Sequence, residues 1–87
     1  MNAPAAGRST GYCLLITVDH DMQAVMRVLD VLVQRSVMPE AINIERRPEA
    51  LAITVTVADF AESDAVSIAR RLQTLVMTRT ANVVPMP

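Results

Sequence analysis

The chain has 87 residues, of which 52% are hydrophobic, and a formal net charge of −1. The single cysteine, Cys13, excludes an internal disulfide. Cys13 and the single histidine, His20, are too few soft ligands for a structural metal site. A domain this small is therefore expected to gain stability from a partner. The acidic balance, the lack of lysine and the presence of only one Tyr and one Phe argue against a nucleic-acid partner, and no apolar run is long enough to span a membrane.

The start of the chain predicts an arm followed by a strand. Residues 1–11 are small and polar and include proline and glycine, which predicts a disordered N-terminal arm. They lack the charged start and the apolar stretch of a secretory signal, so we expect a cytoplasmic protein. Residues 12–18 form a β-branched and apolar run that is too short for a typical helix and therefore predicts the first strand.

A first helix is predicted from the polar turn at residues 19–21 to about residue 35. An aspartate of the turn can serve as the helix N-cap, and Pro39 cannot continue the helix. Apolar residues expected to face the core recur at helical spacing: Met22, Val25, Met26, Leu29, Leu32 and Val33. Because Val28 and Val31 fall outside this stripe, the helix is apolar around much of its circumference, and we expect a partner to bury a second surface of it.

The second half of the chain predicts a hairpin, a helix and a last strand. Residues 41–46 and 51–57 alternate between apolar and polar side chains on either side of a short turn, which is typical of a β-hairpin. Asp59 or Ser63 is expected to cap a second helix. The apolar stripe expected for that helix is Ala65, Ile68, Ala69, Leu72, Leu75 and Val76. A last strand is expected at about residues 80–84, closed by Pro85.

The order of these elements predicts the fold class. A β-α-β-β-α-β chain is the ferredoxin-like arrangement of the α+β class, a four-stranded antiparallel sheet with two helices on one face. We expect it to form one domain over residues 12–85. Many functions occur on this fold, so its residues have to indicate which of them applies here.

Two segments, residues 18–29 and 35–44, resemble the first half of an ACT domain. That family typically shows an acidic turn leading to Pro-Gly, a helix with an Arg-Val pair, an Arg-Gly-aromatic exit and a Glu-Ser-Leu-Asn-type second strand. Residues 40–44 match the last of these elements. This sequence departs from the pattern where Met22-Gln23 stands for Pro-Gly and where Ser36-Val37 stands for the Gly-aromatic exit.

Within the ACT family, the short single domain is similar to the small regulatory subunit of acetolactate synthase, the first enzyme of branched-chain amino-acid synthesis. This resemblance implies a regulatory protein without catalytic residues or a cofactor of its own. It also implies a homodimer, a large thiamine-diphosphate catalytic subunit as partner, and control by valine or another branched-chain amino acid.

The turn after the first strand is the candidate ligand site. The free N–H groups and the positive dipole end of a helix can hold a carboxylate there. The residues predicted to bind a ligand are Asp19, His20, Asp21, Met22, Gln23, Ala24 and Met38. Because two aspartates repel an added anion, the alternative is that they only cap the helix.

A second function remains open beside the enzyme subunit, namely a free-standing ACT-like amino-acid sensor or an interaction module with another partner. Two other classes of protein that share this fold require residues that this sequence lacks. A phosphate-cleaving enzyme needs an anion-binding loop with glycine and arginine after the first strand, whereas this loop is acidic. A metal carrier needs two cysteines in the same loop.

Overall fold

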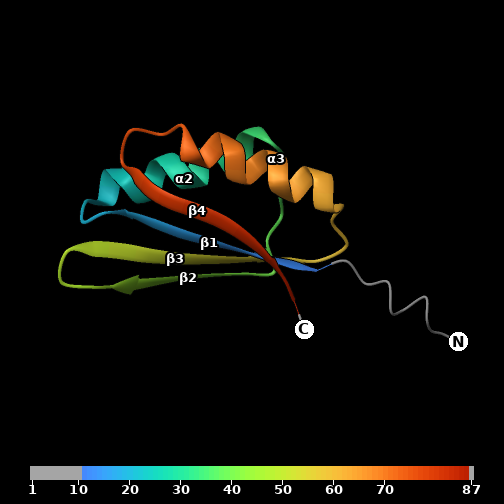
Figure 1. Cartoon of the computed structure of the whole chain (residues 1–87), viewed down its shortest axis with the longest axis horizontal. Helices are drawn as coiled ribbons and strands as arrows, with labels where there is room; N and C mark the ends of the chain where they lie inside the picture. The colour runs from blue at the N-terminus through green and yellow to red at the C-terminus, as the bar shows by residue number, and fades with distance from the viewer. Residues whose placement is uncertain (1–10, 87) are drawn as a thin grey trace, which may run out of the picture.

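The computed structural model describes residues 11–86, so most of the arm predicted over residues 1–11 lies outside the described part of the chain. Its elements follow the predicted β-α-β-β-α-β order: β1 (Tyr12–Asp19), α2 (Met22–Gln34), β2 (Ala41–Arg46), β3 (Ala50–Val57), α3 (Glu62–Gln73) and β4 (Thr78–Pro85). The strands form one antiparallel sheet in the order β2-β3-β1-β4, and Figure 1 shows both helices on the same side of it. The ferredoxin-like prediction is confirmed.

The alternation of β3 sets which side of the sheet is buried. Leu51, Ile53 and Val55 are buried towards the helices. The β1 residues that pair with them are, in the same order, Val18, Ile16 and Leu14. The intervening residues of β3 lie on the open face, away from the helices, and are only half-buried. Since neighbouring residues of paired strands share a face, this single pattern also fixes the orientation of β1, β2 and β4.

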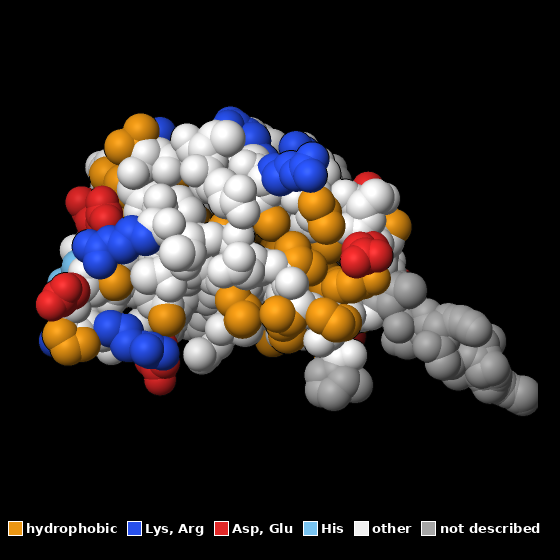
Figure 2. Space-filling model, viewed as in Figure 1, with side chains coloured by type: hydrophobic (Ala, Val, Ile, Leu, Met, Phe, Trp, Pro, Cys, Tyr) orange, Lys and Arg blue, Asp and Glu red, His pale blue; other side chains and the backbone are white. Residues whose placement is uncertain are grey.

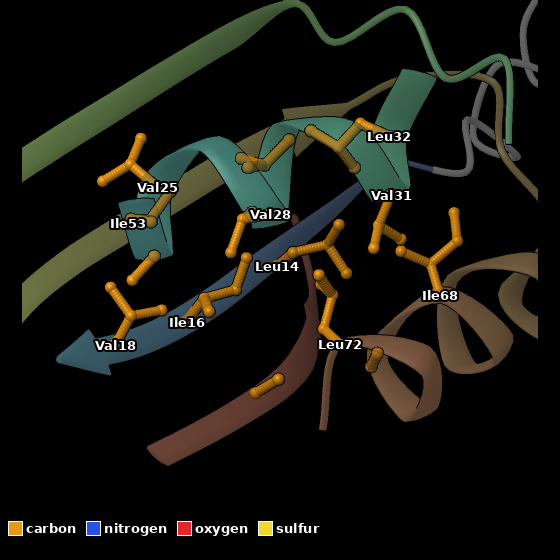
Figure 3. Packing of buried hydrophobic residues seen from close by; sticks show 14 of the residues in the cluster. Leu14, Ile16, Val18, Val25, Val28, Val31, Leu32, Ile53, Ile68 and Leu72 are labelled. Carbon is orange, nitrogen blue, oxygen red and sulfur yellow. The ribbon is translucent and has the colours of Figure 1, made fainter. Parts of the chain in front are cut away.

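The hydrophobic core lies between the sheet and the two helices. Figure 3 shows Val25, Val28 and Val31 of α2 above the β1 side chains, with Val31 turned towards Ile68 of α3. The side chain of Leu72 is fully buried between α3 and the sheet. Burial of this kind supplies most of the stability of a small domain.

The core face of α2 differs from the predicted stripe. Val28 and Val31 were expected outside the stripe but are buried, whereas Met22, Met26 and Val33 were expected in the core and are 64%, 57% and 74% exposed. The physical reason is that α2 carries apolar side chains on two different faces. Periodicity cannot choose between two such faces, and packing against the sheet and α3 chooses the one centred on Val28.

The start and end of α3 also correct the prediction. Its N-cap is Ala61, which makes no side-chain cap hydrogen bond, rather than Asp59 or Ser63. Glu62 and Asp64 in the first turn interact favourably with the helix dipole instead. Because α3 ends at Gln73, Val76 leaves the predicted stripe and is 98% exposed.

The end of α2 explains one departure from the family pattern. Val37 N–H donates to the Leu32 carbonyl at 2.9 Å and Ser36 N–H donates to the Val33 carbonyl at 3.0 Å, which together form a Schellman motif. Ser36 adopts a left-handed conformation with φ 55°. Glycine occupies such a position without steric strain, so the serine carries a conformational cost that the Gly-aromatic exit of the family avoids.

We therefore expect Ser36→Gly to stabilise the protein by about 1 kcal/mol, because relief of left-handed strain outweighs the added entropy of the unfolded chain. Urea unfolding followed by circular dichroism measures the change. Ser63→Gly, inside α3, is the matched control and should destabilise by about 1 kcal/mol. A loss of stability in Ser36→Gly would contradict the claim that the left-handed backbone of Ser36 is strained.

The outer edge of β2 carries free backbone groups. Arg47 N–H donates to the Ala50 carbonyl at 2.9 Å. Since bonded and non-bonded pairs alternate in an antiparallel ladder, the odd-numbered residues of β2 bond to β3. The N–H and C=O groups of Ile42, Ile44 and Arg46 therefore point outwards, and every residue of β2 is exposed.

The other edge strand, β4, is partly covered. The Gln73 side chain of α3 donates from Nε2 to the carbonyl of Ala81 at 2.7 Å. Pro85, the last residue of β4, has no N–H to offer. Beside this end, Met86 N–H donates to the Gly11 carbonyl at 2.9 Å, so the two ends of the described chain lie together. Of the two edges, β2 is the open one.

Candidate functional site

Asp21 of the predicted ligand turn caps α2. Its Oδ1 accepts a hydrogen bond from Gln23 N–H at 2.8 Å, and its own carbonyl accepts one from Ala24 N–H at 3.0 Å. The predicted capping role is therefore confirmed for Asp21. The cap already occupies donors of the first turn that a ligand carboxylate would use.

Asp19 holds the turn against the sheet. Its Oδ1 accepts a hydrogen bond from Arg79 Nε at 2.9 Å, and both side chains are about half exposed. The pairing of the end of β1 with the start of β4 brings these two residues together from 60 positions apart. Arg79 thereby offsets one of the two negative charges that would repel an anion at this turn.

The other residues of the turn divide into exposed and buried. His20, Met22 and Gln23 are exposed, whereas Ala24 is 1% exposed and packs in the core. In Figure 2 the histidine lies among acidic and basic side chains at the end of the molecule where α2 begins. Ala24 is therefore a packing residue, and the accessible groups are His20, Met22 and Gln23.

Met38, the remaining predicted ligand residue, lies at the opposite end of α2 from the turn. It follows the C-terminus of α2 and is 87% exposed. A helix of 13 residues is about 20 Å long, so one copy of the chain does not bring Met38 to Asp19 and Met22. Sequence reasoning missed this separation because it carried residues over from a family pattern without the direction of the helix.

Sequence reasoning also missed a shallow hollow of about 360 Å³ on the open face of the sheet, beside the ligand turn. Its floor is formed by small residues, and two arginines stand at its rim. The lining residues are Thr17, Arg47, Pro48, Glu49, Ala50, Ala52 and Arg79. Arg47 bonds Glu45 at 2.6 Å and Arg79 bonds Asp19, so each arginine at the rim is already paired with a carboxylate.

Large apolar side chains are exposed on α2 and on β2, and we call these five residues together the apolar flank: Met22, Met26, Val33, Ile42 and Ile44. The three residues from α2 lie about half a turn around the helix from Val31, which faces α3, so they are on the side of α2 turned away from α3. The two isoleucines project from β2 towards the helix side of the sheet. They are 39% and 44% exposed.

Two kinds of site are absent from the described part of the chain. Within residues 11–86, no helix is long and apolar enough to cross a membrane. Nor do three His, Cys, Asp or Glu side chains of these residues gather closely enough to hold a metal ion.

Comparison with known proteins gave one family and many structural neighbours. A family model described as an ACT-like domain matches residues 7–86. A search of curated proteins gave no match.

Solved structures that are similar to the chain share its fold at low sequence identity. An uncharacterised protein from Thermotoga maritima is 18% identical over 91% of this chain and 99% of its own, with a TM-score of 0.73. The ACT domain from GTP pyrophosphokinase of Chlorobium tepidum is 6% identical over 87% of this chain and 86% of its own, with a TM-score of 0.75. The regulatory subunit of aspartate kinase from Thermus thermophilus is 16% identical over 90% of this chain and 50% of its own, with a TM-score of 0.64.

Proposed function

We propose that this chain, which belongs to the ACT-like domain family, works as a regulatory subunit that binds an amino acid and changes the activity of a separate catalytic subunit. ACT domains are typical of amino-acid-sensing regulation, and a regulatory subunit of aspartate kinase shares the fold. The more specific proposal is that the catalytic subunit is acetolactate synthase and that the effector is valine or another branched-chain amino acid. The support for this is the match of residues 40–44 to the second strand of the family pattern.

The observation that carries a subunit role is the apolar flank. A small domain that works alone buries its large apolar side chains, and contiguous exposed ones mark a contact surface. Here Met22 and Met26 of α2 are each more than half exposed, and Ile42 and Ile44 of β2 are partly exposed. Methionine suits a contact surface because its flexible side chain adapts to different shapes.

The ligand turn supports an amino acid as effector. An amino acid carries a cationic ammonium as well as an anionic carboxylate. The carboxylate of Asp21 can attract the ammonium while it caps α2. Since Arg79 offsets the charge of Asp19, a ligand carboxylate meets less repulsion than two free aspartates would cause.

The test is reconstitution with the acetolactate synthase catalytic subunit of the same organism. We expect the two chains to co-purify, the chain to raise catalytic activity, and valine to change that activity. Coupling between an effector site and an active site is about 1–3 kcal/mol, so the expected change in apparent affinity is about 5- to 150-fold. Equal activity with and without the chain would reject this partner.

A free-standing amino-acid sensor is the second candidate. It is supported by the uncharacterised Thermotoga maritima protein, nearly all of which is covered by this fold. Calorimetry of the purified chain with valine, leucine and isoleucine separates the two functions. Binding by the chain alone, with no effect on any catalytic subunit, would favour the sensor.

A further inference from the structure

We infer that the groove between α3 and β4 is a docking site for an extended acidic segment of another protein, which pairs with the outer edge of β4 as an added strand. In this arrangement a carboxylate of the segment meets Arg70 of α3. The groove is separate from the ligand turn and from the apolar flank, and the inference does not depend on the proposed function.

The outer edge of β4 has backbone groups that another strand can bond. Met86 N–H donates to the Gly11 carbonyl, so these two residues form a bonded pair just beyond the paired ends of β4 and β1. Because bonded and non-bonded pairs alternate along an antiparallel ladder, the N–H and C=O groups of Ala81 and Val83 point outwards. Such edge groups are a ready template for a further strand.

One side chain of α3 covers this edge. Gln73 is exposed and donates from Nε2 to the outward carbonyl of Ala81 at 2.7 Å. A strand added beside β4 would donate a backbone N–H to the same carbonyl, so Gln73 occupies the position of one hydrogen bond of the docked segment. When the flexible glutamine side chain swings away, the segment replaces it, and the carbonyl has a donor in both states.

A groove of about 260 Å³ lies along the outward backbone groups and can receive side chains of the added strand. Its lining residues are Val66, Ala69, Arg70 and Gln73 of α3 and Ala81, Asn82 and Val83 of β4. In the same view as Figure 1, Figure 2 shows hydrophobic side chains gathered between α3 and β4 with basic side chains beside them. In strand addition of this kind, the backbone supplies affinity and pockets for alternate side chains supply specificity.

The charge of the groove selects an acidic occupant. Arg70 is exposed and is the only charged side chain among the described residues that line the groove. Within residues 11–86 it takes part in neither of the two ion pairs. A guanidinium can donate two parallel hydrogen bonds to a carboxylate. A second copy paired two-fold along the same edge would instead bring its own Arg70 beside this one, and like charges in contact disfavour that pairing.

The test is an NMR titration of the isotopically labelled full chain with the acetylated and amidated peptide Val-Thr-Glu-Thr-Val. In antiparallel addition the first, third and fifth residues of the peptide face the groove, which places the glutamate between two valines. We expect amide shifts confined to α3 and β4, with a dissociation constant of about 1 mM. The same peptide N-methylated at the glutamate loses a donor to β4 and should not bind.

Three substitutions separate this pairing from general charge attraction. Arg70→Glu should weaken binding of the peptide about 10-fold, and a peptide with lysine in place of the glutamate should bind Arg70→Glu in preference to the unmodified chain. Arg71→Glu is the matched control, because Arg71 does not line the groove and bonds Thr74 instead, so binding should change by less than about 2-fold. Gln73→Ala should tighten binding about 5-fold, since it removes the competitor for the Ala81 carbonyl.

The inference is overturned by the absence of saturable shifts up to about 5 mM peptide, by shifts centred on β2, or by equal effects of Arg70→Glu and Arg71→Glu. Weaker binding to Gln73→Ala would also overturn it, because Gln73 would then be a contact of the peptide and not its competitor. Circular dichroism checks that each variant is folded. These measurements use the chain without effector or catalytic subunit, so their failure leaves the proposed function standing, and a failed reconstitution leaves this inference standing.

Discussion

Leu72→Ala is expected to lower the free energy of unfolding by about 2–5 kcal/mol. The Leu72 side chain is fully buried between α3 and the sheet, so its removal loses burial energy and leaves a cavity that rigid strands cannot close. Domains are stable by only about 5–15 kcal/mol, and one this small lies near the lower end. The variant is therefore expected to be partly unfolded near physiological temperature.

Urea unfolding followed by circular dichroism, at one fixed protein concentration for all variants, measures this change. Val76→Ala is the matched control. Val76 follows the end of α3 and is 98% exposed, so its loss should change stability by less than about 0.5 kcal/mol. Equal effects of the two substitutions would mean that α3 does not pack on the sheet as described.

Ile53→Ala is expected to cost a similar amount, about 2–5 kcal/mol, and also to loosen β2 selectively. Ile53 is 1% exposed and lies in register between Ile16 of β1 and Ile44 of β2. Since β3 is the only neighbour of β2 in the sheet, a defect in β3 weakens the one attachment of that edge. Leu72→Ala places a comparable defect on the α3 side of the core.

Amide hydrogen exchange separates the two effects. The amides of Asn43 and Glu45 bond to β3, and we expect them to exchange faster in Ile53→Ala than in Leu72→Ala when the two variants are compared at equal global stability. Identical protection in the two variants would show that β2 opens only when the whole domain unfolds.

The strands could be predicted from the sequence because their alternation of apolar and polar residues is compatible with only one buried face. In β3, strict alternation from Leu51 to Val57 fixes both the strand and its buried face, and the register then orients the rest of the sheet. The face of α2 could not be predicted in this way. Apolar residues such as Met26 and Val28 lie on nearly opposite sides of the helix, and only packing against the sheet and α3 decides which side is covered.

The cap of α3 was predicted wrongly, and the separation of the predicted ligand residues was not foreseen, for different physical reasons. Asp59 and Ser63 both have good capping side chains, but the chain enters the helix at Ala61, which residue preference alone does not indicate. Met38 follows the C-terminus of α2, at the opposite end of the helix from Asp21. A family pattern names both residues without showing how far apart a helix of 13 residues places them.

The hydrogen bond between Gly11 and Met86 has a consequence for how the domain can be joined to other chains. Since the first and last described residues meet at one end of the sheet, a fusion partner or an attached fluorophore at either end would sit beside the start of β1. The turn at Asp19 lies at the far end of the same strand. A label attached at Gly11 or Met86 therefore lies at the end of the sheet away from that turn.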